Sequence, residues 1–397
     1  MRRREVIFGL GGLSATPLFL RVQQPGGGAI QEPTPTFDFQ EPLKCAAGIR
    51  PWRRNSYRLE SERFTSHPAK FVVHNYGHGG AGITLSWGVA SKARDIVRAH
   101  LATTSDRDVA VIGSGVIGLT TATRLMELGL RVTIYAKEFW DKTTSHVAGG
   151  QWAPSKVEYA DTQQFKDILK ISYKTFEQNI GTRFGISKVP NYTKRPQEDL
   201  DEVIRLFAGE EPLIPAPDRL TLPFGHNMGS GYRYQTLLIE PPIFLKQLHA
   251  DLVAANVPFI SRRFSSPRDV LSLRENIIVN CTGFEAKQLW SDNDIVPAKG
   301  QLALLPPQPN LKYLFSRSGQ MFPRTDAIVI GGTYEECSTS PTSDVEVCRG
   351  LVNDIKAVFG VGPVVERFAI HIDHPYNLQD LAPKKGDGEP FRNPCGS

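Results

Sequence analysis

Short apolar runs alternate with a helical pattern around residue 120. An apolar run at 108–112 is followed by apolar positions three or four residues apart from Leu119 to Leu125, and then by a second apolar run at 130–135. The two runs predict buried strands, and the spacing between them predicts a helix with one apolar face. A strand, a helix and a strand in this order form a βαβ unit, which is typical of a parallel sheet.

The rest of the chain has fewer helical patterns. Amphipathic helices are predicted at 161–180 and 243–255, and residues 181–240 between them have the pattern of short strands and loops. Two apolar runs that stop on glycine, at 277–283 and 327–332, predict further strands. The whole pattern predicts an α/β nucleotide-binding domain with a strand-rich second domain, α+β overall.

Composition and charge exclude several classes of protein. Of the 397 residues, 40% are hydrophobic and 22% are charged, which indicates a globular chain long enough for two domains. No apolar run reaches the roughly 18 residues that a membrane-spanning helix needs. The net charge of +5 is spread along the chain and predicts no nucleic-acid partner.

The cysteines and histidines predict no metal site. None of the five cysteines forms a C-x-x-C pair. His74 and His78 lie in a glycine-rich segment rather than on a helix, and neither a carboxylate nor a third histidine is near them in the sequence.

The βαβ unit contains a glycine pattern that binds phosphates. Gly113, Gly115 and Gly118 follow its first strand with the spacing G-x-G-x-x-G. The first glycine permits a tight turn, the second lets the backbone approach a pyrophosphate, and the third lets the helix pack closely on the strand. The helix N-terminus attracts the anion. Glu138, after the second strand, is a candidate partner for a ribose hydroxyl, and a solvated loop charge is the alternative.

A second glycine-dense segment precedes this unit. Residues 72–82 read VVHNYGHGGAG and lead into a helical pattern. A turn so rich in glycine can direct several N–H groups at one acceptor, and a junction of glycine and helix suits an anion or a polar ring.

The N-terminal residues 1–24 have the pattern of an export signal. Three arginines precede an apolar run that reaches Leu20, and the pair Arg3-Arg4 is typical of a twin-arginine signal, which exports folded proteins. A frayed helix on a cytoplasmic protein is the alternative. Residues 25–44 are rich in proline and glycine and predict a linker.

Together these segments resemble the D-amino-acid oxidase family of flavoproteins. The matching stretches are VAVIGSGVIGLTTATRL, TTSHVAGGQWAP, IIVNCTG, VPAKGQ, AIVIGG and HNYGHGGAGITLSWG. The resemblance covers most of residues 45–360. HNYGHGG and AGGQWAP are specific to this family, whereas the glycine-rich βαβ unit is shared by many nucleotide-binding proteins.

The order of the segments differs from that of the family, in which HNYGHGG comes near the C-terminus. Here it stands at 74–80, before the glycine loop. The resemblance therefore implies a circularly permuted chain, which compact domains tolerate because their termini often lie close together. A Rossmann-like FAD-binding domain would take residues 71–160 and 257–300, a substrate-binding domain 45–70, 161–256 and 301–375, and a C-terminal tail 376–397.

The resemblance implies FAD, rather than a nicotinamide, as the cofactor. Thr143–Ser145 would donate near the pyrophosphate, and Gly149–Gln151 would pass along the flavin ring. The residues that would surround the cofactor are Gly79, Gly80, Gly82, Thr84, Gly113, Gly115, Val116, Ile117, Glu138, Thr143, Thr144, Ser145, Gly149, Gly150, Gln151 and Gly283.

The resemblance also implies the substrate contacts. In the family, an arginine in a Gly-hydrophobe-Arg-Pro motif binds the substrate carboxylate, and here this residue is Arg50. A guanidinium matches a carboxylate with two parallel hydrogen bonds. A structural ion pair is the alternative role. The backbone carbonyl of Gly80 would accept a hydrogen bond from the substrate amine.

The chain departs from the family at two substrate-facing tyrosines. Counting back from Pro323 gives Ser316 and Gln320 at their positions. Arg317, in the same stretch, would receive a second acidic group or be an exposed loop charge. The candidates for a replacement of the lost hydroxyl are Gln320, Tyr232 and Tyr234.

These assignments imply an FAD-dependent oxidase of D-amino acids. Hydride would pass from the substrate Cα to flavin N5, the imine would hydrolyse to a keto acid and ammonia, and molecular oxygen would reoxidise the flavin to give hydrogen peroxide. The expected partners are therefore an amino acid or amine and oxygen. Four alternatives stay open: a secondary-amine or imino-acid oxidase, a flavin dehydrogenase of the same fold, a nicotinamide-dependent dehydrogenase, and a catalytically inactive flavoprotein. The sequence indicates no oligomeric state.

Overall fold

The structure is a computed structural model that describes residues 31–37, 43–65, 69–225, 228–316 and 319–362. The predicted export signal (1–24) and C-terminal tail (376–397) lie outside the described residues, as does part of the linker. Arg317 also lies outside them.

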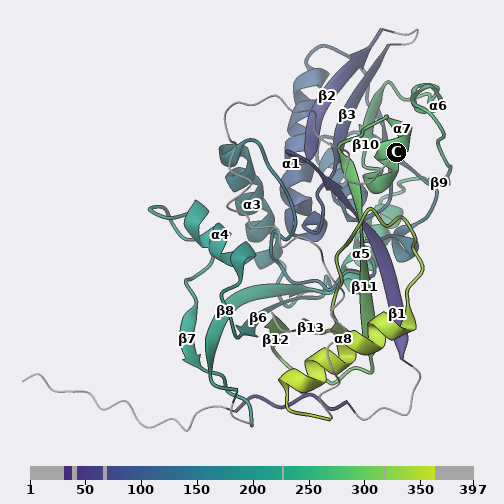
Figure 1. The fold of residues 1–397 in the computed structure, drawn as a ribbon. Coiled ribbons are helices and arrows are strands. Elements are labelled where there is room, and N and C mark those ends of the chain that lie inside the picture. Colours follow the sequence, from purple (N-terminus) through teal and green to yellow (C-terminus); the bar gives the residue numbers. More distant parts are fainter. Residues whose placement is uncertain (1–30, 38–42, 66–68, 226–227, 317–318, 363–397) are drawn as a thin grey trace, which may run out of the picture.

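A six-stranded sheet occupies the upper half of the molecule in Figure 1. Its strands, in spatial order, are β2 (Arg58–Phe64), β3 (Lys70–Tyr76), β10 (Ile277–Asn280), β4 (Asp108–Ile112), β5 (Arg131–Ala136) and β9 (Phe259–Ser261). Neighbours from β3 to β9 are parallel, and β2 joins the edge antiparallel to β3. The predicted βαβ unit is confirmed as β4, α2 (Val116–Met126) and β5.

Both faces of this sheet are buried, which explains the uninterrupted apolar runs of its strands. Val109 and Val111 of β4 belong to a core that also contains residues of α1 (Gly82–Leu101), α2, α3 (Thr162–Glu177) and α5 (Pro241–Ala254). Ala110 of the same strand belongs to a smaller core with residues of α6 (Pro267–Leu271) and α7 (Ala286–Leu289). Alternate residues of one strand therefore serve opposite faces.

A larger, mostly antiparallel sheet forms the lower half (Figure 1). Its strands, in spatial order, are β1 (Lys44–Arg53), β11 (Ile295–Leu305), β14 (Ile328–Ile330), β13 (Met321–Pro323), β12 (Leu314–Ser316), β6 (Ile186–Thr193), β8 (Ser230–Ile239) and β7 (Asp218–Thr221), and β15 (Glu335–Glu336) pairs with β11. The helix α8 (Val345–Val358) contacts β11 and β14, and its buried Ile355 packs in their core.

The two long strands β1 and β11 run between the two halves, as Figure 1 shows. They pair antiparallel from Lys44 opposite Leu304 to Arg53 opposite Ile295. The chain leaves β1 through a short turn into β2, and it reaches β11 from β10 through the short helices η2 (Gly283–Glu285) and α7. The same two strands therefore hold the two sheets together.

Several predicted elements are confirmed, and the helices α4 and α8 (Val345–Val358) were missed. The helices predicted at 161–180 and 243–255 are α3 and α5. The segment 181–240 contains the strands β6, β7 and β8, but also the helix α4 (Glu198–Leu206). Its apolar residues Leu200, Val203, Ile204 and Phe207 have helical spacing, so the signal was present in the sequence, but it extends over only two turns.

The two sheets also differ from the predicted domain bounds in two places. Residues 45–70 were assigned to the substrate-binding domain, but β2 pairs with β3 in the six-stranded sheet. Residues 257–300 were assigned to the FAD-binding domain, but β11 begins at Ile295 and belongs to the larger sheet. The physical reason is that β1 and β11 pass from one half to the other, so no single cut in the sequence separates the halves.

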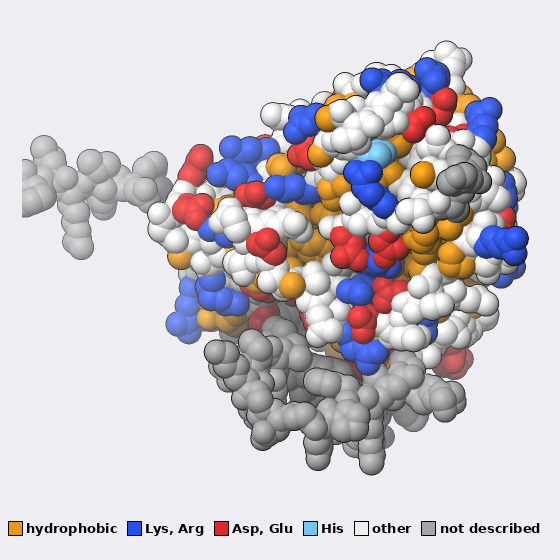
Figure 2. All heavy atoms as spheres, turned by 90° about the horizontal axis from the view of Figure 1, so that it is seen from above, with side chains coloured by type: hydrophobic (Ala, Val, Ile, Leu, Met, Phe, Trp, Pro, Cys, Tyr) orange, Lys and Arg blue, Asp and Glu red, His pale blue; other side chains and the backbone are white. Residues whose placement is uncertain are grey.

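The surface and the described helices add two observations. Acidic and basic side chains are interspersed on the face shown in Figure 2, so neither sign dominates that face. Within the described ranges, no helix is both long and apolar enough to cross a membrane, and no three potential ligands cluster as a metal site.

Candidate active site

A cavity of about 1000 Å³ is lined by residues from both sheets. The structure brings to its wall Arg50, Gln320 and all the residues that were predicted to surround the cofactor, although they come from seven separate segments of the chain. They are Arg50, Gly79, Gly80, Gly82, Thr84, Gly113, Gly115, Val116, Ile117, Glu138, Thr143, Thr144, Ser145, Gly149, Gly150, Gln151, Gly283 and Gln320.

The N-terminus of α2 points its backbone into this cavity. Gly113 has a φ of 107°, and a Cβ there would lie 2.4 Å from the carbonyl oxygen of Cys281. A Cβ on Gly118 would lie 1.9 Å from the carbonyl oxygen of Gly113, so both positions require glycine. The first turn of α2 has no acidic residue, and its N-cap, Gly115, has no capping side chain. The turn therefore offers N–H groups and the positive end of the helix dipole to an anion such as a pyrophosphate.

Two buried polar atoms on the cavity wall, Asn75 Oδ1 and His78 Nε2, have no hydrogen-bond partner among the described residues. Burial lowers the pKa of His78 to about 3, so its ring is neutral at pH 7. Unpaired buried polar atoms are costly, and a ligand with polar edges would satisfy both. Together with the glycine turn and the size of the cavity, these atoms fit a flavin dinucleotide.

Two predicted cofactor contacts use their hydroxyls within the protein. Thr84 Oγ1 donates to the carbonyl of Ala153 at 2.8 Å and accepts from its N–H at 3.2 Å. Ser145 Oγ accepts from the N–H of Val116 at 3.1 Å. These hydroxyls connect the start of α1 and the start of α2 to the segment 143–153, and so fix the walls of the cavity relative to each other.

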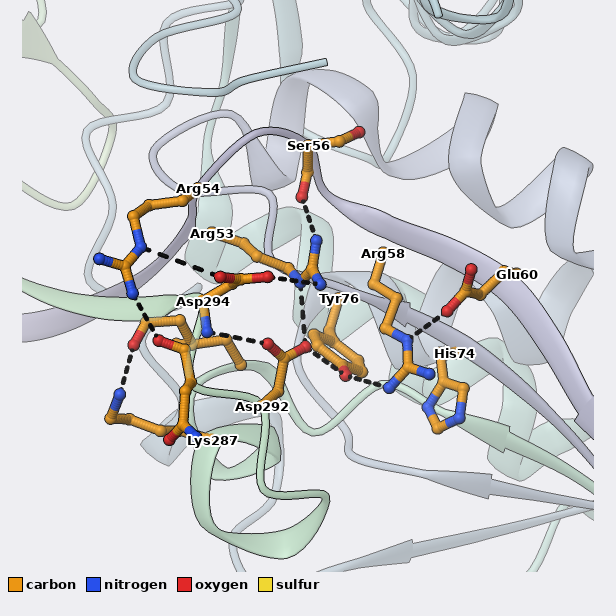
Figure 3. A network of polar contacts seen from close by, with 12 residues as sticks. Arg53, Arg54, Ser56, Arg58, Glu60, His74, Tyr76, Lys287, Asp292 and Asp294 are labelled. Atoms are coloured by element: carbon orange, nitrogen blue, oxygen red, sulfur yellow. Dashed lines mark hydrogen bonds and ion pairs between the residues drawn. The ribbon is translucent and has the colours of Figure 1, made fainter. Parts of the chain in front are cut away.

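A network of polar contacts holds the end of β1 against the end of β3 (Figure 3). Arg53 Nε and Tyr76 Oη both donate to Asp292 Oδ2, at 2.9 Å and 2.8 Å. Arg58 Nη1 donates to Tyr76 Oη at 2.9 Å. Burial of Asp292 opposes its ionisation, but the hydrogen bonds from Arg53 and Tyr76 hold its pKa below the ordinary value. The network anchors the residue that immediately precedes the turn 77–80.

That turn pairs directly with β1. The N–H of Gly79 donates to the carbonyl of Pro51 at 3.0 Å, and Trp52 forms a β-bridge with His78. This pairing holds the turn that ends at Gly80 against Pro51, the residue after Arg50. The two residues predicted to contact the substrate amine and carboxylate are therefore held by backbone hydrogen bonds.

Arg50 itself is fixed by packing and by one hydrogen bond. Its Nη1 donates to the carbonyl of Thr333 at 2.9 Å, and its guanidinium lies against Gly300 and Gly332. No carboxylate among the described residues forms an ion pair with it, so the alternative of a structural ion pair finds no partner there. Burial lowers the pKa of Arg50, and the nearby Tyr334 and the carboxylate of Glu335 raise it, but an arginine stays charged in either case.

The replacements predicted for the lost tyrosines have different places in the structure. Gln320 lines the cavity. Tyr232 and Tyr234 are not among its lining residues, so that prediction was wrong, and Tyr234 Oη instead donates to Asp201 Oδ1 at 2.8 Å. Both tyrosines lie on β8, which the predicted pattern could not place relative to Arg50. Ser316 is buried, and its Oγ donates to Asn191 Oδ1 at 3.0 Å.

A chain of buried amides connects the Ser316 position to the cavity. Asn191 Nδ2 donates to Gln197 Oε1 at 2.5 Å, and Gln151 Nε2 donates to the same oxygen at 3.2 Å. Gln197 Nε2 donates back to Gln151 Oε1 at 3.3 Å. Where the family has a tyrosine, this chain therefore has a polar network that ends in two glutamines on the cavity wall.

The sequence analysis missed four residues of the substrate end, which are Tyr334, Lys156, Gln197 and Asp199. Tyr334 follows β14 and lies beside Arg50, since its phenol influences the pKa of that guanidinium. Its only signal in the sequence is that it stands two residues after a strand that stops on two glycines. Asp199 and Lys156 belong to segments with no signal for a site.

Comparison with known proteins settles the family. The family described as "DAO: FAD dependent oxidoreductase" matches residues 108–392, which is more than half of the chain. The chain belongs to this FAD-dependent oxidoreductase family. It is therefore an oxidoreductase, its cofactor is FAD, and the cavity residues described above fit that group.

Characterised relatives of this family member share about a quarter to a third of its residues. It is 30% identical over 260 residues to the D-amino-acid oxidase of Streptomyces coelicolor, which covers 64% of this chain and 78% of the relative. It is 27% identical over 271 residues to the D-aspartate oxidase of Homo sapiens, with 62% and 74% covered. A solved structure, iminodiacetate oxidase from Chelativorans sp. BNC1, superimposes with a TM-score of 0.45 at 16% identity, covering 64% of this chain and 79% of that one.

Proposed function

We propose that this oxidoreductase is an oxidase of D-amino acids. The observation that carries the proposal is the guanidinium of Arg50, which faces the cavity that also contains the phosphate-binding turn of α2. Its packing and its hydrogen bond to the Thr333 carbonyl fix the guanidinium. No described carboxylate forms an ion pair with it, although Glu335 lies near enough to favour its charged form. The carboxylate of an amino acid would supply a negative charge opposite the guanidinium, and its two oxygens match the planar N–H donors of Arg50.

The residues of the chain orient the substrate for oxidation at Cα. Bound FAD supplies the acceptor for the two electrons of the Cα–H bond and returns them to oxygen. Arg50 binds the α-carboxylate, and the carbonyl of Gly80 accepts from the amine. Both contacts belong to backbone-paired segments, so two of the four substituents of Cα are held. The Cα–H bond would have to face bound FAD, and this third constraint would select one enantiomer.

The residues of the cavity orient the substrate and exclude water, and no histidine among them transfers a proton. His78 is the histidine on the cavity wall, and its pKa of about 3 means that it neither carries a charge nor takes a proton at neutral pH. A neutral ring at His78 leaves the binding of the substrate carboxylate to the guanidinium of Arg50.

The test is anaerobic mixing of the purified protein with a panel of D-amino acids, with the L-enantiomers as controls. We expect the flavin absorbance to bleach with D-amino acids alone and to return with hydrogen peroxide when air is admitted. Bleaching without peroxide would indicate a flavin dehydrogenase. Faster bleaching by N-methyl or imino acids would indicate a secondary-amine oxidase, and no bleaching by any D-amino acid would overturn the proposal.

A further inference from the structure

We propose that Gln301 is a positioning residue that holds the carboxylate of Glu335 apart from Arg50, so that the guanidinium stays free for the substrate carboxylate. The inference rests on the proposed function and adds to it a residue that does not touch the substrate. Gln301 ends the stretch VPAKGQ on β11. It is 2% exposed and does not line the cavity, so it can affect the substrate only through other residues.

Every polar group of Gln301 has a hydrogen-bond partner. Its backbone N–H donates to Thr333 Oγ1 at 3.0 Å, and its carbonyl accepts from the N–H of Thr333 at 3.2 Å. In its side chain, Oε1 accepts from the N–H of Asp344, the N-cap of α8, at 2.6 Å. Nε2 donates to Glu335 Oε1 at 2.7 Å. The buried amide therefore connects β11 both to the start of α8 and to the segment that carries Glu335.

The carboxylate of Glu335 is held by three groups. Gln301 Nε2 and Thr333 Oγ1 both donate to its Oε1, at 2.7 Å and 2.6 Å. Its Oε2 is 3.8 Å from Nζ of the buried Lys299. The backbone of the same segment is fixed as well, because β15 pairs with β11 and places Glu335 opposite Lys299. These contacts give the carboxylate a defined orientation.

Arg50 reaches the same segment from β1, on the other edge of β11. Its Nη1 donates to the carbonyl of Thr333 at 2.9 Å. Thr333 thus contacts Arg50 through its carbonyl and Glu335 through its hydroxyl, which places the two charges near each other. Burial lowers the pKa of Arg50, whereas the carboxylate of Glu335 acts to raise it. The structure describes both side chains, and they form no ion pair with each other.

An unrestrained Glu335 would compete with the substrate for Arg50. Opposite charges at this separation attract each other, and a carboxylate of the chain itself is always present, whereas the substrate must bind from solution. An ion pair of Glu335 with Arg50 would occupy the planar donors that a substrate carboxylate needs. The hydrogen bonds from Gln301 and Thr333 to Glu335 oppose that ion pair.

Replacing Gln301 by methionine keeps most of the side-chain volume and removes both of its polar atoms. In Gln301→Met we expect KM for D-alanine to rise roughly fivefold, the upper end for a partly exposed ion pair, with kcat and FAD content unchanged. Adding Glu335→Gln removes the competing charge, so the double variant should return KM toward that of Glu335→Gln alone. A structural defect left by Gln301→Met would persist in the double variant, so the recovery distinguishes positioning from a structural role.

Gln308→Met provides the matched control. The side chain of Gln308 also uses both ends of its amide, since it accepts from the N–H of Thr36 at 2.9 Å and donates to the carbonyl of Thr36 at 2.8 Å. It does not line the cavity, and we expect its replacement to leave KM and kcat unchanged. An unchanged KM in Gln301→Met, or a raised KM that does not recover when Glu335 is also replaced, would overturn the inference.

Thr333→Val tests the same restraint if Gln301→Met does not fold. The variant keeps the shape of the side chain and removes the second hydroxyl donor to Glu335. KM for D-alanine should rise and should recover when Glu335→Gln is added. A rise in KM that persists in this double variant would contradict the inference.

Binding of pyruvate separates the inference from the proposed function. Perturbation of the flavin absorbance by this carboxylate gives a dissociation constant without turnover. Weaker binding to Gln301→Met, with recovery in the double variant, would support the role of Gln301 even if no D-amino acid were oxidised. If D-amino acids are oxidised but neither KM nor the dissociation constant follows this pattern, the proposed function stands and the role of Gln301 is wrong.

Discussion

Arg50 occupies space that a side chain on Gly300 would fill. A Cβ there would lie 2.2 Å from Nη1 of Arg50 and 2.4 Å from its Cζ, so Gly300→Ala must displace the guanidinium. We expect kcat/KM to fall by roughly a hundredfold, the value of one charge-assisted bidentate contact of about 3 kcal/mol, with the FAD content unchanged. Steady-state peroxide assays and the flavin absorbance measure both quantities.

Gly350 on α8 offers the matched control, because a Cβ there meets nothing within 4 Å. Gly350→Ala should leave the kinetics unchanged and stabilise the helix by about 0.5–1 kcal/mol. Normal activity of Gly300→Ala would show that the guanidinium does not have to be where the structure places it.

Direct replacement of Arg50 tests the shape of the contact as well as its charge. Arg50→Ala should lose roughly a hundredfold in kcat/KM on the best amino acid. Arg50→Lys retains the charge but not the planar pair of donors, so it should recover only part of the loss. Near-normal kinetics of Arg50→Ala, or a loss of flavin that accounts for the whole defect, would move the carboxylate site elsewhere.

At this scale, the sequence identified the residues whose roles depend on local backbone chemistry. Gly113 and Gly118 were predicted from a spacing, and the structure shows carbonyl oxygens where their Cβ atoms would be. Tyr334, Lys156 and Asp199 were missed because their place in the cavity depends on how distant segments pack. A side chain that only lines the cavity wall belongs to no motif, so the residues around it in the sequence show no recognisable spacing.

Among the elements, the N-terminus of α2 is the one on which cofactor binding depends. A Cβ on Gly115 would lie 3.2 Å from Ser145 Oγ and 4.0 Å from Thr143 Cβ, so the Ser145 hydroxyl must move slightly, but no backbone atom blocks a side chain there. The same side chain would project toward the proposed pyrophosphate. Gly115→Val should therefore fold but lose FAD on purification, as circular dichroism and the flavin absorbance would show. Full occupancy by FAD would exclude this turn as the pyrophosphate site.

The helices and strands also show which elements a periodic apolar pattern can predict. The strand β4 and the helix α2 were predicted because their apolar positions recur over several residues. The helix α4 has only two buried residues, and three of its first four residues are acidic. Acidic residues at a helix start stabilise the helix through its dipole, but in a sequence they are indistinguishable from a solvated loop. This short helix nevertheless carries Asp199.

At the scale of the whole molecule, we propose that the chain is circularly permuted relative to its family. The family match begins at residue 108, while Arg50, Gly79 and Gly80 precede it. The connection at 102–107, between α1 and β4, would then be the join. A chain opened between Ser105 and Asp106, with residue 397 joined to residue 31 by a glycine–serine linker, should still purify with FAD. A colourless or insoluble product would count against the permutation.

We also propose that the protein is exported folded, although residues 1–24 lie outside the described part of the chain. Replacing Arg3-Arg4 by two lysines should block export from a bacterial host while leaving the flavin content of the retained protein intact, because the change alters none of the residues that line the cavity. Cell fractionation with a flavin measurement tests this. Export at the normal rate would exclude a twin-arginine signal.

The strands β1 and β11 have a thermodynamic consequence. Both belong to the larger sheet. β1 continues through a short turn into β2 of the smaller sheet, and β11 follows β10 of the smaller sheet through η2 and α7, so unfolding of one sheet displaces strands of the other. The molecule should therefore unfold in a single calorimetric transition despite its two sheets. A ligand bound in the cavity would raise the melting temperature of the whole chain rather than of one half. Any carboxylate that binds at Arg50, substrate or not, then becomes detectable by heating the protein in its presence.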